Sequence, residues 1–332
     1  MEELYNTRLK KMYTTVNNFM IFTEFFCCPF YQKPLAKSFG IVDNTCRNEV
    51  EYIMGIKLIA FDLDGTFLDP KKNIPPDNIK ALEEAAAKGV VIVPATGRIV
   101  GGVPQQIREL PFIRYYVTAN GAFVYDALED KAVARAEIPL EDALSLLRYE
   151  DGLGIPYDCY QDGWGYMSAE MHARAGDFVP DPGILNLVLS LRTEVPELKE
   201  YLRRKGESVQ KLQLYFTDMQ ERARQLEVLP GMFPGMAFTT SVPFNIEINS
   251  SAATKGQGLA ALCSLLGIRP EEVLAFGDDR NDADMIRFAG VGVAMENAIE
   301  ELRAAADWVT ASNAGAGVAR GIEHFVLGSG SE

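Results

Sequence analysis

The sequence predicts an α/β protein with a Rossmann-like parallel-sheet core and an inserted α+β domain. Short β-forming runs alternate with helical patterns in two parts of the chain, 54–135 and 245–328. Such alternation is typical of parallel strands joined by right-handed helical crossovers. The intervening residues 136–244 are richer in Pro, Tyr and Gly and mix both patterns. We therefore expect 136–244 to form a separate domain inserted into the core.

Each element of the core has a local signal. Ile56–Phe61 is an almost unbroken apolar run, as expected for a strand covered on both faces. Further strands are predicted at Val90–Pro94, Tyr115–Thr118, within Glu271–Phe276, Val291–Ala294 and Trp308–Thr310. Helices are predicted at Ile79–Lys88, Asn281–Ala289 and Asn297–Ala306, the first two with a glycine directly after them. In the inserted part, Lys211–Thr217 alternates like a strand and Ala143–Tyr149 is helical.

Length and composition narrow the class of protein. A chain of 332 residues suggests about two domains, and 48% hydrophobic with 23% charged residues is ordinary for a globular protein. The net charge of −14 would repel nucleic acid and anionic lipid, so we expect neither nucleic acid nor a membrane as partner. An acidic protein that handles an anion needs a local cation.

Cysteine and histidine usage excludes other classes. The five cysteines are odd in number and lack C-x-x-C spacing, which fits a reducing compartment, so we expect a cytoplasmic protein. His172 and His324 are the two histidines, too few for a His-rich metal site, and no G-x-S-x-G motif accompanies them. The sequence leaves the oligomeric state open.

Residues 1–53 differ from the rest of the chain. Their apolar run Phe19–Phe30 contains Glu24 and is shorter than the roughly 20 residues that a bilayer span needs. Met54 immediately precedes the first predicted strand. We expect an N-terminal extension that is dispensable for folding and activity; the alternative is an arm that packs on the domain.

The first strand leads into Asp62-Leu63-Asp64-Gly65-Thr66. Ligands of parallel sheets bind beyond the carboxyl ends of strands, so both carboxylates could face one pocket. A calcium loop is excluded because the third acidic ligand is missing and Asn73 stands at the twelfth position. An acidic turn without chemistry is the remaining alternative.

Further polar motifs follow the next two strands. Thr96-Gly97 offers a hydroxyl and a closely approachable backbone N–H to a phosphate oxygen. Asn120-Gly121 is first of all a turn signal. Lys255 opens a helix, where the dipole disfavours a cation unless an anion is bound there. The alternatives are that Thr96-Gly97 and Asn120-Gly121 form ordinary turns and that Lys255 is an exposed surface lysine.

A fourth motif, Gly277-Asp278-Asp279-Arg280-Asn281-Asp282, follows a predicted strand. Part of its charge is ordinary for a helix N-terminus. Asp278 is expected at the same sheet edge as Asp62 and Asp64, and three converging carboxylates repel unless a cation neutralises them. An all-oxygen site suits Mg²⁺. Carboxylates, a hydroxyl, a lysine and Mg²⁺ together indicate phosphoryl transfer.

The motifs, in this order and spacing, resemble those of the haloacid dehalogenase-like superfamily, specifically its Cof-type phosphatases with a large inserted cap. The motifs are Asp62-Leu63-Asp64-Gly65-Thr66, Ala95-Thr96-Gly97-Arg98, Asn120-Gly121-Ala122, Lys255-Gly256, and Gly277-Asp278 with Asn281-Asp282. The resemblance covers about 55–327. It implies an α+β cap domain that closes over the pocket and reads the leaving group.

The resemblance also implies residue roles. Asp62 would be the nucleophile that forms an aspartyl-phosphate, and Asp64 would protonate the leaving oxygen and then activate water. The implied phosphate-binding residues are Thr96, Gly97, Lys255 and Asn281. The implied Mg²⁺ ligands are Asp62, Asp278 and the backbone carbonyl of Asp64, with Asn120 and Asp282 in support.

The expected function is that of a Mg²⁺-dependent phosphatase of small phosphorylated metabolites, such as sugar phosphates, nucleotides, flavin mononucleotide or pyridoxal phosphate. A sugar phosphomutase has similar motifs and is an alternative; it would retain phosphate on its product. A phosphate-binding module without catalysis is the alternative from another class. The complete set Asp62, Asp64, Thr96, Lys255 and Asp278 argues against it.

Overall fold

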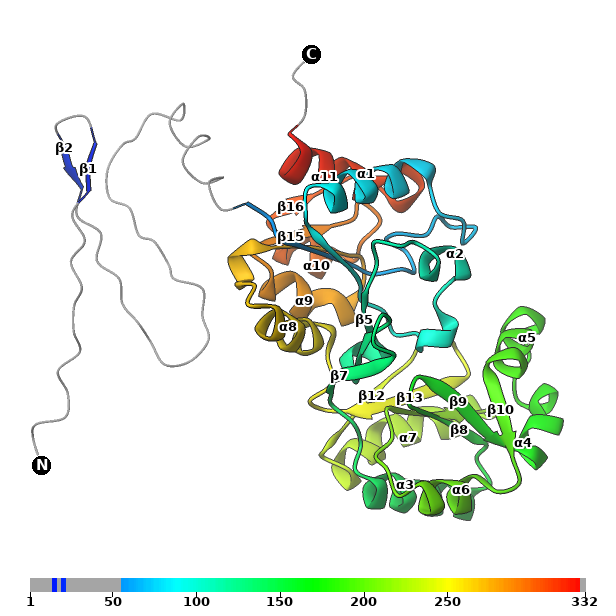
Figure 1. Cartoon of the computed structure of the whole chain (residues 1–332). Helices are drawn as coiled ribbons and strands as arrows, with labels where there is room; N and C mark the ends of the chain where they lie inside the picture. Colours follow the sequence, from blue (N-terminus) through cyan, green and yellow to red (C-terminus); the bar gives the residue numbers. More distant parts are fainter. Residues whose placement is uncertain (1–13, 17–18, 22–54, 329–332) are drawn as a thin grey trace, which may run out of the picture. The chain divides into compact units, whose positions relative to one another are not determined.

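The computed structural model describes residues 14–16, 19–21 and 55–328, and the chain divides into two units, 1–53 and 54–332. In the first unit, β1 (Thr14–Val16) pairs antiparallel with β2 (Phe19–Ile21) (Figure 1). The expectation that 1–53 is dispensable concerns residues that lie almost wholly outside the described ones. No helix within the described ranges combines the length and hydropathy needed to cross a membrane.

The core of the second unit is a five-stranded parallel sheet in the order β16-β15-β14-β3-β4. Its strands are β3 (Leu58–Phe61), β4 (Val91–Pro94), β14 (Val273–Gly277), β15 (Val291–Ala294) and β16 (Trp308–Val309). The first four are fully or almost fully buried, which is why their sequences are continuous apolar runs.

Helices cover both faces of this sheet (Figure 1). The helices are α1 (Pro76–Ala87), α2 (Gln105–Arg108), α8 (Lys255–Leu266), α9 (Ala283–Phe288), α10 (Glu300–Ala305) and α11 (Gly317–Ile322). Helix α1 packs beside α11, and α8 packs beside α9. Helix α8 begins where the Thr254 hydroxyl accepts a hydrogen bond from the Gln257 N–H, and ends at Gly267 with a φ of +66°.

The third predicted strand departs from the expected parallel sheet. β5 (Tyr115–Thr118) belongs to a three-stranded antiparallel sheet with β6 (Phe123–Asp126) and β7 (Lys131–Arg135). It touches the core sheet through an isolated bridge between Ala95 and Val117. The chain reverses directly after β5, with positive φ at Ala119 and Asn120, so β6 rather than a helical crossover follows it.

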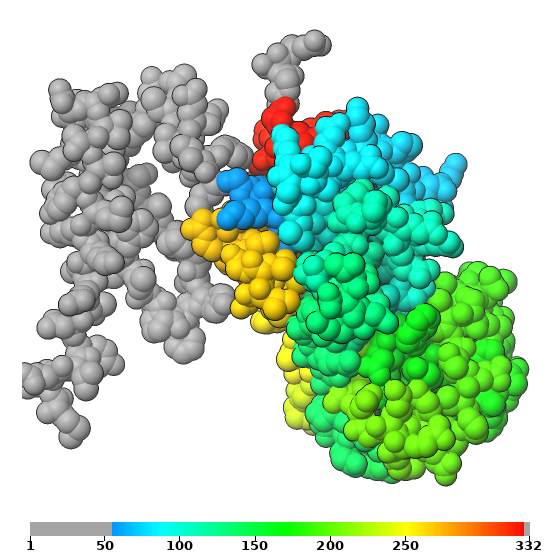
Figure 2. Space-filling view, in the orientation of Figure 1, coloured from blue at the N-terminus to red at the C-terminus, as the bar shows by residue number. Residues whose placement is uncertain are grey.

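The inserted part contains a six-stranded sheet in the order β10-β9-β8-β11-β13-β12. Its strands are β8 (Tyr157–Gln161), β9 (Trp164–Ser168), β10 (Arg192–Val195), β11 (Lys211–Tyr215), β12 (Met236–Thr239) and β13 (Asn245–Ser250). Its helices are α3 (Leu140–Leu153), α4 (Ala169–Ala173), α5 (Pro182–Leu191), α6 (Leu198–Lys205) and α7 (Met219–Met232). In the space-filling view, the green and yellow-green residues of this part of the chain form one lobe, and yellow residues, the colour of β12 and β13 on the bar, border it (Figure 2).

The C-terminal boundary of the inserted part differs from the sequence prediction. The sequence predicts that 245–328 belongs to the core, yet β13 (Asn245–Ser250) pairs with β11 and β12 in the six-stranded sheet. The pattern Asn-Ile-Glu-Ile-Asn alternates strictly, which is typical of an antiparallel strand, and the return to the core follows Ser250. The structure therefore extends this sheet about six residues beyond the predicted border at 244.

Candidate active site

The sequence motifs meet at one edge of the core sheet. Asp62 follows β3, Thr96 lies just beyond β4, and Asp278 follows β14. These three strands are neighbours in the order β14-β3-β4 and run parallel, so their carboxyl ends lie side by side. The side chains after them therefore share the position where ligands of open α/β sheets bind.

The Lys255 side chain bridges two of the carboxylates. Its Nζ lies 2.6 Å from Asp62 Oδ1 and 2.6 Å from Asp282 Oδ1, and its exposed fraction is 0%. Burial alone would lower the pKa of Lys255, but the charges of Asp282 and Asp62 outweigh it and raise the pKa above its ordinary value. The ammonium is thus a permanent buried cation in an acidic protein.

Burial, with a smaller contribution from neighbouring carboxylates, raises the pKa of two carboxyl groups at this edge. Burial raises the pKa of Asp62 to about 7, opposed by Lys255 and reinforced by the charge of Asp282. Burial also raises the pKa of Asp278 to about 6, although the Thr66 hydroxyl, 2.7 Å from Asp278 Oδ1, opposes the shift. Burial thus disfavours the ionised form of both carboxyl groups, and the charge of Asp282 adds to the effect, so a further cation beside them would favour ionisation.

Asp282 organises the turn after β14. Its Oδ2 accepts hydrogen bonds from the backbone N–H of Asp278 at 2.9 Å and of Asp279 at 3.1 Å, while its Oδ1 faces Lys255. Gly277 is required here because an added Cβ would lie 2.4 Å from the Asp282 Cβ. Asp282 therefore fixes the position of both Asp278 and Lys255.

The side chain of Asp64 lies apart from this cluster. Arg98 donates from Nε to Asp64 Oδ2 and from an Nη atom to Oδ1, both at 2.7 Å, and Lys72 Nζ reaches Oδ1 at 2.7 Å. Burial would raise the pKa of Asp64, but these cationic partners lower it to about 2. Asp64 is consequently ionised at neutral pH.

The remaining predicted site residues line the same edge. The Thr96 side chain is buried, and its hydroxyl oxygen accepts a hydrogen bond from the Arg98 N–H at 3.2 Å. Asn281 donates to the Asn120 side-chain oxygen at 3.2 Å, which joins the motifs after β14 and β5. A Cβ at Gly97 would lie 3.0 Å from that same oxygen, so Gly97 permits the close approach.

Several contacts at the site had no counterpart in the sequence prediction. Arg98, Thr66 and Asn297 have no role in the sequence prediction, although all three lie in segments that resemble the family, and Lys72 lies outside those segments. Asn297 donates to the Gly65 carbonyl at 2.8 Å. The one available signal was the position of Arg98 and Thr66 next to a strand end.

The donor set fits a divalent cation that prefers oxygen. Ligand oxygens of Asp62, Asp278 and Asp282 all lie within 4.8 Å of one another. Asp282 already serves Lys255 and two backbone amides, so Asp62 and Asp278 are the carboxylates with remaining capacity. The side chain of Asp64 is not part of this group, and its predicted contribution was the backbone carbonyl. Hard oxygen donors in small number suit Mg²⁺, which retains several waters.

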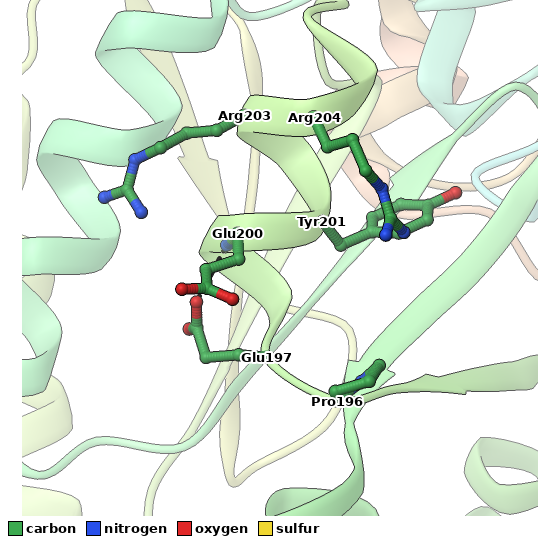
Figure 3. Close-up of a pocket in the computed structure, with 6 residues that line it drawn as sticks. All are labelled: Pro196, Glu197, Glu200, Tyr201, Arg203 and Arg204. Atoms are coloured by element: carbon green, nitrogen blue, oxygen red, sulfur yellow. Dashed lines mark hydrogen bonds between the residues drawn. The ribbon is translucent and has the colours of Figure 1, made fainter.

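A separate surface hollow lies on the inserted part. It is lined by residues of α6 and the segment before it: Pro196, Glu197, Glu200, Tyr201, Arg203 and Arg204 (Figure 3). Glu197 uses its carboxylate to cap α6 by accepting from the N–H groups of Lys199 and Glu200. The hollow holds none of the residues after the core strands.

Comparison with known proteins identifies the family. The family model of haloacid dehalogenase-like hydrolases matches residues 59–322. The chain belongs to this family, and its solved structural neighbours include subclass IIB phosphatases, the Cof type. The expected resemblance is confirmed, and so is the α/β fold with additional sheets.

Among the similar proteins are two that are named phosphatases. The 5-amino-6-(5-phospho-D-ribitylamino)uracil phosphatase YcsE of Bacillus subtilis is 31% identical over 82% of this chain and 96% of its own. A haloacid dehalogenase-like hydrolase from Bacteroides thetaiotaomicron has a TM-score of 0.70 at 26% identity over 81% of this chain and 99% of its own. The subclass IIB sugar phosphatase BT4131 has a TM-score of 0.65 at 27% identity, over 81% and 98%. This chain is therefore a phosphatase acting on phosphorylated substrates.

The variant Gly65→Ala tests the geometry of the site. At φ +92°, a Cβ on Gly65 would lie 2.1 Å from Asp278 Oδ2, so Gly65→Ala must displace that carboxylate. We expect kcat to fall about a hundredfold, the cost of roughly 1 Å of misplacement at a reacting centre. Steady-state phosphatase kinetics measure the change.

Gly89→Ala is the matched control. Gly89 has a similar φ of +86° but nothing within 4 Å of an added Cβ. We expect this variant to lose about 1 kcal/mol of unfolding free energy from backbone strain and to retain its kcat. Equal loss of activity in both variants would show that strain, and not the position of Asp278, explains the first result.

Proposed function

We propose that this protein is a Mg²⁺-dependent phosphatase of small phosphorylated metabolites that works through an aspartyl-phosphate on Asp62. The observation that carries the proposal is the contact of Lys255 with Asp62 beside Asp278 at the edge of the core sheet. A carboxylate can attack phosphorus only if the charges of the phosphate and of the carboxylate itself are balanced. A buried ammonium and an oxygen-lined cation site supply that balance.

The residues around Asp62 divide the work of the first step. The Asp62 carboxylate attacks phosphorus in line, and the leaving oxygen departs on the opposite side. Lys255 orients Asp62 through Oδ1 and offers its charge to a phosphate oxygen. The Thr96 hydroxyl and the Gly97 N–H hold further oxygens, with Asn281 at the rim. When bound, Mg²⁺ held by Asp62, Asp278 and the Asp64 carbonyl supplies charge neutralisation.

The Asp64 carboxylate is ionised in the structure, and this is the form that the second step, attack of water on the aspartyl-phosphate, requires. Its carboxylate is ionised and oriented by two hydrogen bonds from Arg98, as a general base that activates water must be. The first step needs the protonated form, which donates to the leaving oxygen. The Arg98 contact must therefore loosen while the substrate is bound, so that Asp64 can carry a proton.

The proposal includes a substrate class, the boundaries of the cap domain and a cytoplasmic location. YcsE is named for a phosphorylated ribityl compound and BT4131 is named a sugar phosphatase, and both support a small phosphorylated metabolite as substrate. We assign residues 136–250 to the cap, on the basis of the strand pairing of β13. The buried free thiols of Cys159 and Cys263 fit a cytoplasmic protein.

Asp62→Asn tests the proposed nucleophile. The amide is nearly isosteric but a poor nucleophile, so we expect phosphate release from p-nitrophenyl phosphate with Mg²⁺ to fall by at least about a thousandfold. Circular dichroism serves as the folding control. Turnover equal to that of the parent protein rules out Asp62 as nucleophile. In the same assay with a sugar phosphate as substrate, phosphate retained on the sugar product instead of released would favour the phosphomutase.

The raised carboxyl pKa values predict how Mg²⁺ binding depends on pH. Because Asp62 and Asp278 have folded-state pKa values of about 7 and about 6, the native protein retains protons that the unfolded chain releases. Without metal, these groups reduce stability as pH rises from about 4 to about 7. Mg²⁺ must displace the same protons, so its effect on Tm should be larger at about pH 8 than at about pH 5.5.

Calorimetry with and without Mg²⁺ measures this difference, with Asp278→Asn as the control that lacks one ligand. We expect the variant to show a smaller Mg²⁺-induced shift at both pH values. A shift that is the same at both pH values, or unchanged in Asp278→Asn, contradicts the assignment of the metal site.

A further inference from the structure

The carboxylate of Asp284 joins two helices beside the site described above. Its Oδ2 accepts a hydrogen bond from the backbone N–H of Gly256 at 3.0 Å, in the first turn of α8. Its Oδ1 accepts a hydrogen bond from the N–H of Met285 at 2.9 Å, in the first turn of α9. Neither the sequence motifs nor the proposed mechanism uses Asp284.

The segment after β14 holds Lys255 through both its side chain and its backbone. Asp282 Oδ1 lies 2.6 Å from Lys255 Nζ, and two residues later Asp284 accepts from the N–H of the residue that follows Lys255. One short stretch of chain, 282–284, therefore fixes both ends of the same lysine. Movement of α8 against this stretch would carry the ammonium away from Asp62, which lies 2.6 Å from it.

The close approach at Gly256 shows how tightly the two helices meet. A Cβ on Gly256 would lie 2.7 Å from Asp284 Oδ2 and 2.8 Å from the backbone carbonyl carbon of Asp284. Glycine is a poor helix former, so its presence in the first turn of a 12-residue helix needs a separate reason. The room that it leaves for Asp284 supplies that reason.

A lysine at the start of a helix is an electrostatic conflict that Asp284 helps to resolve. The first N–H groups of α8 carry partial positive charge, and Lys255 adds a full charge beside them, so an anion is favoured there. The chain's own acceptors meet this need: Asp284 binds the Gly256 N–H, and the Thr254 hydroxyl accepts from the Gln257 N–H at 3.2 Å. A phosphate is then bound through the Lys255 ammonium rather than through these two amides.

The ordinary role of an acidic residue at a helix start explains half of this arrangement. Asp284 is half-buried, and a carboxylate in the first turn of α9 interacts favourably with the dipole of that helix. That role uses Oδ1 and the adjacent Met285 N–H. The second oxygen binds a different helix, 28 residues away in sequence. A hydrogen bond to an ionised acceptor is shorter and stronger than one between neutral groups, so it can set the position of α8.

Other contacts hold α8 from a different neighbour. Gly121, after β5, leaves room for the Thr254 carbonyl oxygen, and a Cβ on Gly258 would lie 2.9 Å from the Val117 side chain of β5. These contacts fix α8 against β5, which contributes no carboxylate to Lys255 among the described residues. Asp284 fixes α8 against the segment that does contribute one.

We propose that Asp284 is a positioning residue of this phosphatase, which fixes the start of α8 so that the Lys255 ammonium meets Asp62 and the phosphate. Asp284 acts through the Gly256 N–H and the backbone of Lys255, without touching the substrate. Its loss impairs the transition state more than the fold, because the ammonium balances charge that develops during phosphoryl transfer. This inference rests on the proposed function and adds a residue to it.

The variant Asp284→Ala gives the first test. We expect kcat for p-nitrophenyl phosphate with Mg²⁺ to fall about ten- to a hundredfold, the effect of up to roughly 1 Å of misplacement at a reacting centre. The Ki of orthovanadate, whose five-coordinate form resembles the phosphoryl group in transfer, is expected to rise by at least about tenfold. A Ki does not depend on the amount of active protein, so partial misfolding does not imitate this result.

Two further variants separate the hydrogen bond from other effects of the substitution. In Asp284→Asn, the amide oxygen can still accept from the Gly256 N–H, so we expect kcat and Ki within about fivefold of the parent values. In Gly256→Ala, the added Cβ displaces the Asp284 carboxylate, so we expect losses like those of Asp284→Ala, although alanine is the better helix former.

Asp218→Ala and Gly152→Ala are the matched controls. Asp218 accepts hydrogen bonds from the N–H groups of Gln220 and Glu221 at the start of α7, and Gly152 lies in α3 with nothing within 4 Å of an added Cβ. We expect the parental kcat and Ki in both controls, with a lower Tm in Asp218→Ala because a helix cap is lost.

Three results would overturn the proposal and leave the proposed function intact. They are parental kcat and Ki in Asp284→Ala, equal losses in Asp284→Asn and Asp284→Ala, and a rise in Ki in Asp218→Ala as large as that in Asp284→Ala. Absence of phosphate release by the parent protein would contradict the proposed function instead.

Discussion

The contact of Lys255 with Asp62 and Asp282 is the interaction on which the site depends. One ammonium, with no exposed surface, joins α8 to the ends of two neighbouring strands. Without it, two buried carboxylates would lack their cationic partner. Removing one partner of a buried ion pair typically lowers the free energy of unfolding by about 4 kcal/mol. The same charge that makes this arrangement tolerable is available to a phosphate oxygen, so structure and chemistry share one group.

Close backbone approach is the second constraint. Gly277 makes room for Asp282, and Gly121, whose Cβ would lie 2.0 Å from the Thr254 carbonyl oxygen, lets the start of α8 approach the turn after β5. These glycines let Lys255 lie at the strand ends. A side chain at either glycine position would force the neighbouring segments apart. The inserted sheet approaches the same part of the core, where Lys211 Nζ on β11 lies 3.5 Å from the Gly97 carbonyl oxygen.

Much of this arrangement could be predicted from sequence because it depends on strand ends. β15 was predicted with its observed bounds, and the motifs after β3, β4 and β14 meet because parallel strands are neighbours. Three features could not be predicted. The Arg98–Asp64 contact depends on loop conformation, β5 turns back through residues with positive φ, and β13 joins the cap through pairing with β11. Each is set by partners distant in sequence, which local periodicity does not encode.

In the proposed mechanism, Asp62, balanced by Lys255 and a divalent cation, carries the phosphoryl group during turnover. Rapid acid quench of the protein with a phosphate monoester and Mg²⁺, followed by peptide mass spectrometry, tests it most directly. We expect an increase of about 80 Da, one phosphoryl group, on the peptide that contains Asp62, with borohydride reduction converting this residue to homoserine. Substrate turnover during which the Asp62 peptide stays unmodified, or a phosphoryl group on another residue, would contradict it.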